Sequence, residues 1–225
     1  RDVERSRGLG DVYKRQRVRR TYRGGALLDV FLGRQRGTDG FFPEDWISSF
    51  VEAKNRDYIP GEGITRLEDG RLITDAVGGG MFGQGRTEPG VLIKLLDSGE
   101  RLGIQVHPTD AYAKKLFGSD YGKTESWHVL STRRINDEEP RVYLGFKPGL
   151  TRELWTEYYR TQNVNAMLNA LHEIPVKPGD TILVAGGTPH AIGGGCMLLE
   201  IQQPSDYTMR CETCLLYTSD AADEA

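Results

Sequence analysis

Short apolar runs separated by turn residues make up most of this chain. The runs of buried-strand length cover residues 91–96, 102–106, 125–131, 141–146, 181–185 and 197–202. Apolar runs of about four to eight residues bounded by turn signals are typical of strands, whereas helices need about ten residues or more. Turn residues such as Asp97-Ser98-Gly99 fill the intervals between the runs. The pattern therefore predicts a mainly β fold.

Two stretches have helical periodicity instead. Pro108-Thr109-Asp110 predicts the start of a short helix that ends near Phe117, with Thr109 as the N-cap. Residues 151–172 carry their apolar side chains on helical faces. Short strands, tight glycine turns and one helical insertion together predict a β-sandwich or a barrel of the jelly-roll type.

Composition narrows the class of protein and its partners. The 225 residues suit one large domain or two small ones, and 38% of them are hydrophobic. A run of about eighteen apolar residues, which a membrane-spanning helix needs, is absent from the sequence. The net charge of −3 without a long basic block argues against nucleic acid as a partner. Three cysteines do not make a disulfide framework, so the reducing cytoplasm is the simplest location.

The two ends of the chain differ from the rest. Residues 1–16 read RDVERSRGLGDVYKRQ and residues 214–225 read CLLYTSDAADEA. Both strings resemble translated sequencing-adapter sequence, so we expect them to be non-native and exclude them as one would a fusion scar. Ordinary disordered termini are the alternative. The native region expected from this interpretation is 17–213.

A possible metal site is indicated by four residues. Gln105 and His107 lie two positions apart on a predicted strand and therefore share one face. His190 lies at a tight bend, and Glu125 begins a predicted strand. One amide, two imidazoles and one carboxylate would form a mixed nitrogen and oxygen site that suits Zn²⁺. Periodicity alone leaves open the alternative that these histidines are hydrogen-bonded structural residues.

Three segments carry a family resemblance. The segments 105–108 (QVHP), 121–125 (YGKTE) and 187–193 (GTPHAIG) resemble the metal-binding motifs of the type I phosphomannose isomerases, which are zinc enzymes of the cupin superfamily. The flanking segments 43–48, 92–96 and 199–210 also fit, so the resemblance extends over the expected native region in the right order. The short bacterial form of the family is the most similar. The resemblance implies a cupin-type jelly-roll β-barrel with a small helical insertion.

The resemblance also implies an activity and the residues that perform it. The expected reaction interconverts mannose 6-phosphate and fructose 6-phosphate through an enediol, with one zinc ion per chain. The implied zinc ligands are Gln105, His107, Glu125 and His190, the implied catalytic residues are Lys123, Glu200, Asp206 and Arg210, and the implied substrate-binding residues are Lys94, Lys123 and Arg210. Relatives often carry serine at the position of Gly103, where this chain lacks a hydroxyl.

The same resemblance implies that the region is cut at its C-terminal end. We therefore expect weak or no activity from the chain itself, a sugar phosphate as the partner, no nucleic acid, no membrane, and a monomer or weak homo-oligomer. A non-catalytic sugar-phosphate-binding cupin is the first alternative, and an iron-dependent cupin oxygenase is the second. The ligand set, with a glutamine and without a third histidine, favours the isomerase over the oxygenase.

The sequence holds other signals that we set aside. The glycines of 78–83 match a dinucleotide-binding pattern, but further glycine and proline residues follow where a helix would be needed, so a loop is expected there. His128 alternates in phase with Ser126 and should face away from the metal site. His172 is expected at the end of a helix, where a histidine is favourable for the dipole.

Overall fold

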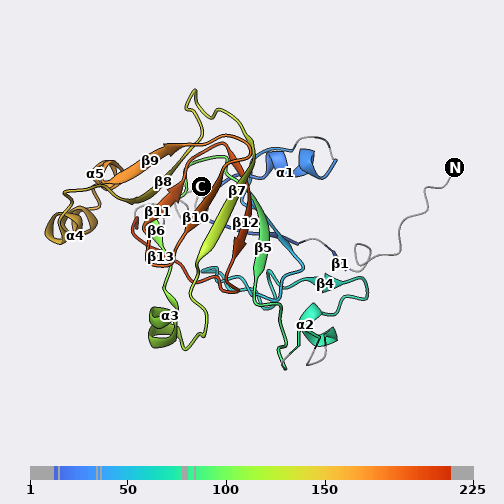
Figure 1. The fold of residues 1–225 in the computed structure, drawn as a ribbon. Helices are drawn as coiled ribbons and strands as arrows, with labels where there is room; N and C mark the ends of the chain where they lie inside the picture. Colours follow the sequence, from blue (N-terminus) through green and yellow to red (C-terminus); the bar gives the residue numbers. More distant parts are fainter. Residues whose placement is uncertain are drawn as a thin grey trace.

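Two antiparallel sheets form the body of the protein. The computed structural model describes residues 13–14, 16–33, 35, 37–77, 81–83 and 85–213. One sheet has six strands in the order β10-β7-β12-β5-β3-β2, and the other has five in the order β13-β6-β11-β8-β9 (Figure 1). Side chains from both sheets, among them Trp127 and Leu198 from the first and Val142 and Ile192 from the second, share one core cluster. The mainly β prediction is therefore confirmed.

The strands of the six-stranded sheet are β2 (Gln16–Val18), β3 (Glu44–Ile47), β5 (Leu92–Asp97), β7 (Glu125–Thr132), β10 (Thr181–Val184) and β12 (Cys196–Gln202). The strands of the five-stranded sheet are β6 (Gln105–Val106), β8 (Arg141–Phe146), β9 (Leu171–Pro175), β11 (His190–Ile192) and β13 (Met209–Arg210). A separate ladder joins β1 (Tyr13–Lys14) to β4 (Arg66–Leu67). The helices are α1 (Ala26–Phe31), α2 (Ile73–Ala76), α3 (Asp110–Phe117), α4 (Arg152–Thr161) and α5 (Val164–Asn169).

Alternation along β7 divides the interior into an apolar part and a charged part. Successive side chains of a strand point to opposite faces, so Glu125, Trp127 and Val129 share the inner face. Val129 and Trp127 pack in the apolar core, where burying a large apolar side chain contributes about 1.5–3 kcal/mol. Glu125 is equally buried but lies at the opposite end of the strand, together with the charged residue Glu200 of the neighbouring strand β12.

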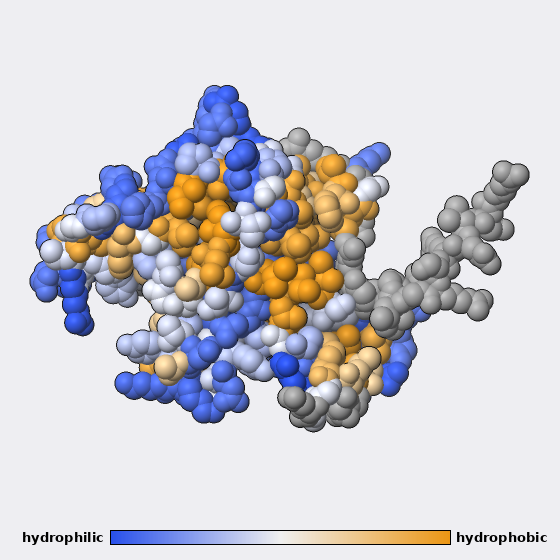
Figure 2. Space-filling view, in the orientation of Figure 1, coloured by the Kyte–Doolittle hydropathy of each residue, from blue (hydrophilic) through white to orange (hydrophobic). Residues whose placement is uncertain are grey.

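The pairing of β12 with β7 contains one irregularity. Leu198 is opposite Val129 but Met197 is opposite Ser131, so Leu130 has no partner residue in the ladder. Beyond this bulge the register is regular, and Glu200 pairs with Trp127. The outer face of the same sheet is rich in apolar surface (Figure 2), and Leu183 and Ile201 are 69% and 44% exposed.

The first predicted helix is confirmed and the second is shorter than expected. The helix α3 spans Asp110–Phe117, and the Thr109 side chain accepts a hydrogen bond from the backbone N–H of Tyr112. The predicted helix over 151–172 is wrong at its end, because Gln162 adopts a left-handed conformation that ends α4 and the chain is already in a strand at Leu171. His172 consequently lies in β9, paired with Leu144, and not at a helix end.

Some predictions concern the ends and loops. Part of the segment 1–16 takes part in ladders, since β1 pairs with β4 and Gln16 begins β2. Residues 214–225, and residues 78–80 of the glycine-rich pattern, lie outside the described residues. The assignment of 17–213 as the native region stays a prediction. None of the helices in the described ranges combines the length and apolar character needed to cross a bilayer.

Candidate functional site

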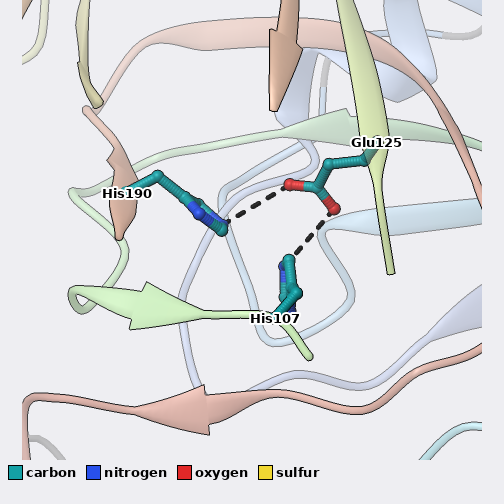
Figure 3. A group of neighbouring side chains, drawn as sticks. All are labelled: His107, Glu125 and His190. Carbon is teal, nitrogen blue, oxygen red and sulfur yellow. Dashed lines mark ion pairs between the residues drawn. The ribbon is translucent and has the colours of Figure 1, made fainter. Parts of the chain in front are cut away.

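Three side chains from three strand ends meet inside the barrel. His107 follows β6, Glu125 is the first residue of β7, and His190 is the first residue of β11 (Figure 3). The Nε2 atom of His107 lies 3.3 Å from Oε2 of Glu125, and Nε2 of His190 lies 3.5 Å from its Oε1. All three side chains are buried, and their ligand atoms lie within 4.8 Å of one another. The arrangement could hold a metal ion.

Backbone hydrogen bonds hold the segments that carry these side chains together. The backbone N–H of Lys123 donates to the carbonyl of Pro108, and the N–H of Gly187 donates to the carbonyl of His107. Two glycines make this approach possible: a Cβ at Gly122 would lie 2.5 Å, and one at Gly186 2.7 Å, from the carbonyl oxygen of Pro108. Real Cβ atoms do not approach a backbone oxygen that closely, so the motif needs glycine at these positions.

The surroundings of both imidazoles prepare them to bind a metal. The Nδ1 atom of His107 lies 3.0 Å from the Tyr207 carbonyl, and Nδ1 of His190 lies 2.9 Å from that of Thr188. A carbonyl oxygen can only accept, so each Nδ1 carries the proton and each Nε2 offers a lone pair toward Glu125. Burial, followed by the charge of His107, lowers the pKa of His190 to about 4, so the ring is neutral at pH 7. Neutral imidazoles are the form that binds metals.

The amide of Gln105 completes the group. Gln105 is directly opposite His190 in the ladder between β6 and β11, and its Nε2 lies 3.3 Å from Nε2 of His190. Amide oxygen and nitrogen are assigned from the hydrogen-bond network, so either atom can face this point. The structure therefore brings together all four side chains that the sequence indicated as ligands.

The ammonium group of Lys123 lies among the same atoms. Its Nζ is 2.8 Å from Nε2 of His107 and 2.9 Å from Oε2 of Glu125. Burial alone would raise the pKa of Glu125, but Lys123 and the histidines lower it well below its ordinary value. The point between these side chains thus favours positive charge, which a divalent metal ion would also supply.

Further buried charges continue from Lys123 across the interior. Oε1 of Glu200 lies 3.8 Å from Nζ of Lys123 and 3.1 Å from Nζ of Lys94. Lys94 is also 3.6 Å from Oε2 of Glu44, a buried carboxylate that Trp46 and Tyr22 hydrogen-bond. Burial and the charge of Glu125 raise the pKa of Glu200 to about 8, against the opposing effect of the two lysines. Glu200 is therefore a carboxyl group that titrates near neutral pH.

A cavity of about 420 Å³ opens beside this row of charges. That volume is in the range of small-molecule sites. The predicted residues that line it are Lys94, Gln105, Lys123, Glu125, Glu200, Asp206 and Arg210. The two histidines do not line the cavity and are fully buried. Gly103 also lines it and contributes no side chain.

The two remaining predicted residues differ in their surroundings. Arg210 is exposed and donates from Nη1 to the Thr21 hydroxyl 3.0 Å away. Asp206 is buried, and both its oxygens accept hydrogen bonds from Arg20. Burial by itself would raise the pKa of Asp206, but Arg20 and Lys94 lower it below its ordinary value.

Arg20 and Glu44 were missed by the sequence reasoning, although both line the cavity. Glu44 lies within the segment 43–48 that the family resemblance included, and its strand alternation with Trp46 could have placed it inside. Arg20 follows other basic residues in a segment without apolar period, so the sequence offers no signal for it. His128 faces outward as predicted, 2.8 Å from the hydroxyl of Thr181.

Comparisons with known proteins agree with the resemblance. No family model matches the chain. Mannose-6-phosphate isomerase of Streptococcus mutans is 40% identical over 136 residues, and mannose-6-phosphate isomerase ManA of Bacillus subtilis is 37% identical over 133 residues. These alignments cover 60% and 59% of this chain but only 38% of each relative. The chain thus matches well under half the length of these curated relatives.

Solved structures show the same fold. The crystal structure of mannose 6-phosphate isomerase from Bacillus subtilis matches 89% of this chain and 60% of its own, with a TM-score of 0.67 and 27% identity. A variant of phosphomannose isomerase from Salmonella typhimurium matches 89% of this chain and 69% of its own, with a TM-score of 0.61 at 13% identity. The resemblance to the phosphomannose isomerases and the cupin-type fold are therefore confirmed.

Proposed function

We propose that this chain carries the metal-binding core of a mannose-6-phosphate isomerase, an enzyme that interconverts mannose 6-phosphate and fructose 6-phosphate. The observation that carries the proposal is the buried group of His107, Glu125 and His190. Glu125 belongs to this group and also lines a cavity that is bordered by further titratable side chains. The identity with mannose-6-phosphate isomerases, 40% over 136 residues in one relative, supports the same activity.

The proposed metal is a single Zn²⁺ ion held by Gln105, His107, Glu125 and His190. The donor set supports zinc, because two neutral imidazoles, one carboxylate and one amide oxygen form a borderline-soft site. When bound, the ion would supply a Lewis acid that stabilises negative charge on oxygen. The carbonyl groups of Tyr207 and Thr188 would keep both imidazoles in the required tautomer.

The proposed reaction moves a proton between C1 and C2 of the sugar through an enediol. Such a transfer needs a group whose pKa lies near the working pH. Glu200 meets this requirement, because burial and the charge of Glu125 raise its pKa to about 8. Lys94 and Lys123 flank its carboxyl group and would hold its negative charge in place. We therefore propose Glu200 as the proton carrier and the two lysines as its positioning partners.

Arg210 would bind the negatively charged part of the substrate. It lines the cavity but is exposed, so its guanidinium is accessible to a phosphate or an enediolate oxygen. Lys94, by contrast, is buried and already paired with Glu44 and Glu200. This geometry favours Arg210 for phosphate contact and places Lys94 deeper, beside the proposed proton carrier.

The test measures metal content and proton exchange on the full chain. We expect one zinc per chain and incorporation of deuterium at C2 of mannose 6-phosphate in D₂O, an assay sensitive enough for a weakly active enzyme. Chelation should stop the exchange and added zinc should restore it. Exchange that persists after complete metal removal would contradict the proposed role of zinc. Zinc and sugar phosphate binding without any exchange would instead favour the non-catalytic sugar-phosphate-binding cupin.

A third reading, the iron-dependent oxygenase, predicts a different outcome. Such an enzyme would be most active with Fe²⁺ and would consume oxygen, and the deuterium exchange would be absent. The cytoplasmic location, the monomeric or weakly oligomeric state and the absence of nucleic acid among the partners stay predictions from the sequence. Cys196 and Cys211 are both free in the described part of the chain, which is compatible with a reducing compartment.

A further inference from the structure

We infer that Arg20 is a positioning residue for the metal centre: by holding Asp206 it fixes the adjacent Tyr207 carbonyl, which orients the imidazole of His107. The inference rests on the proposed function, since it assigns a task within the same site. Arg20 comes from the segment that follows β2, and its partner Asp206 lies 186 positions later in the chain.

Arg20 uses its whole guanidinium group in buried contacts. Nη1 and Nη2 each lie 3.0 Å from an oxygen of Asp206, so the pair is bidentate. Nε lies 3.0 Å from Oε1 of Glu44, and Nη1 also lies 3.1 Å from Oδ1 of Asn55. The guanidinium carbon lies 5.1 Å from the ring centroid of Trp46. These contacts fix the guanidinium in one position, because each of its nitrogen atoms has a partner.

Asp206 is bound just as completely. Besides the two bonds from Arg20, its Oδ2 accepts the backbone N–H of Lys54 at 2.8 Å. A carboxylate with both oxygens engaged, and with a pKa below its ordinary value, is poorly suited to carry a proton. It is well suited to anchor the chain. We therefore assign Asp206 a positioning task in place of the acid–base role that the family resemblance implied.

The anchored segment reaches the metal centre within one residue. The carbonyl of Tyr207, the residue next to Asp206, is the group that accepts the Nδ1 proton of His107 at 3.0 Å. The neighbouring parts of the segment are held separately, by the hydrogen bond from Ser205 to the Gly122 carbonyl and by the pairing of β13 with β6. Among the described residues, Arg20 forms the ion pair that tethers the stretch between them.

The first test compares zinc affinity across three variants of the full chain, by competition with a chromogenic chelator. Arg20→Met should weaken zinc binding about tenfold, the lower end of the range for partners of metal ligands. Arg20→Lys should weaken zinc binding less than Arg20→Met does. The ammonium keeps the positive charge but cannot donate two parallel hydrogen bonds to the carboxylate, as the guanidinium does. Arg19→Met is the matched control, since Arg19 is exposed and, within the described part of the chain, its side chain pairs only with the surface residue Asp57. Its affinity should stay within about twofold of the wild type.

The second test measures the hydrogen bond of the His107 imidazole directly in metal-free protein. The Nδ1–H proton of His107 should give a hydrogen-bonded, slowly exchanging signal in ¹⁵N NMR spectra, assigned by its absence from His107→Asn. Arg20→Met should lose this protection while the signal of His190, whose partner is the Thr188 carbonyl, remains. A general loosening of the fold would affect both signals, so the difference between them isolates the positioning effect.

A folding defect does not remove the test. If Arg20→Met fails to fold, the double variant Arg20→Gln, Asp206→Asn removes both charges of the pair and avoids leaving one buried and unpaired. Unchanged zinc affinity and an unchanged His107 signal in any folded variant that lacks the pair would overturn the inference. Wild-type protein that binds zinc but neither binds nor isomerises sugar phosphate would overturn the proposed function alone. If the wild type binds no zinc, the His107 signal decides the positioning role by itself.

Discussion

Nζ of Lys123 lies 2.8 Å from Nε2 of His107, the atom that a metal ion would use. A bound divalent cation and this ammonium group would therefore compete for the same lone pair. The two groups also repel each other: two unit charges about 4 Å apart in a protein repel by about 4 kcal/mol, and the second charge of a divalent ion roughly doubles this repulsion. The charge of Lys123 thus weakens metal binding, although Lys123 and the metal are both assigned to one reaction.

The first prediction follows from this opposition. Lys123→Met should raise the affinity for zinc at least about tenfold, because it removes a like charge from the site. The same change should reduce turnover of sugar phosphate at least about a hundredfold, since it removes a positive group beside Glu200. Chelator competition and the deuterium exchange assay measure the two effects. Lys114→Met, which changes an exposed lysine, is the control. Weaker zinc binding in Lys123→Met would show that Lys123 supports the metal and does not compete with it.

The second prediction concerns the ligands. His190→Ala should abolish stoichiometric zinc binding together with turnover, because it removes one of two imidazoles whose Nε2 faces Glu125. His128→Ala is the matched control, since His128 lies on the face of β7 opposite to Glu125 and its Nδ1 is 2.8 Å from the Thr181 hydroxyl. Metal analysis after desalting distinguishes them. A full equivalent of zinc in purified His190→Ala would contradict the ligand assignment.

The third prediction is a pH dependence of metal-free stability. Burial raises the pKa of Glu200 to about 8, above the value of about 4.3 for an unfolded glutamate. Between these two values the folded protein holds a proton that the unfolded chain releases, so this group lowers stability as the pH rises toward 8. Glu200→Gln cannot lose a proton. Its melting temperature relative to the wild type should therefore increase by several degrees between pH 5 and pH 8. An equal difference at both pH values would show that Glu200 has an ordinary pKa.

The fourth prediction tests the close packing of the motifs. Gly122→Ala should lower the free energy of unfolding by about 2 kcal/mol or more, because its Cβ would lie 2.5 Å from the Pro108 carbonyl and 2.7 Å from the carbonyl carbon of Thr109. It should also weaken zinc binding, since Pro108 follows His107. Gly40→Ala, which meets no atom within 4 Å, should change stability by less than about 0.5 kcal/mol. Urea denaturation measures both, and equal stability of the two variants would refute the packing argument.

Local patterns predicted part of the site. Two-residue alternation placed Gln105 and His107 together, whereas the family resemblance supplied Glu125 and His190 as their neighbours. The first inference works because strand alternation is fixed by the backbone and requires no knowledge of distant partners. The same reasoning correctly turned His128 away from the metal group. The sequence placed His190 at a tight bend and missed the strand β11 that it begins, because three residues are too few to show a period.

Long-range partners were beyond the sequence. Asp206 was interpreted as an acid–base group, and nothing near it in the chain indicates that Arg20 holds both its oxygens. The end of the helical region was also misjudged, because Leu171 and His172 continue an apolar helical pattern but pair with β8 once the sheets assemble. In both cases the outcome depends on tertiary contacts that override local preference.

The unpaired Leu130 in β7 makes the two ends of this strand unequal in their tolerance of a deletion. Val129 is opposite Leu198 and Ser131 is opposite Met197, so deleting Leu130 would join these two pairs into one continuous ladder and leave every other side chain on its own face. A deletion between Glu125 and Val129, where the pairing is regular, would instead turn Glu125 out of the interior. A gene could thus lose the codon of Leu130 and keep the centre, but could not lose one nearer to Glu125.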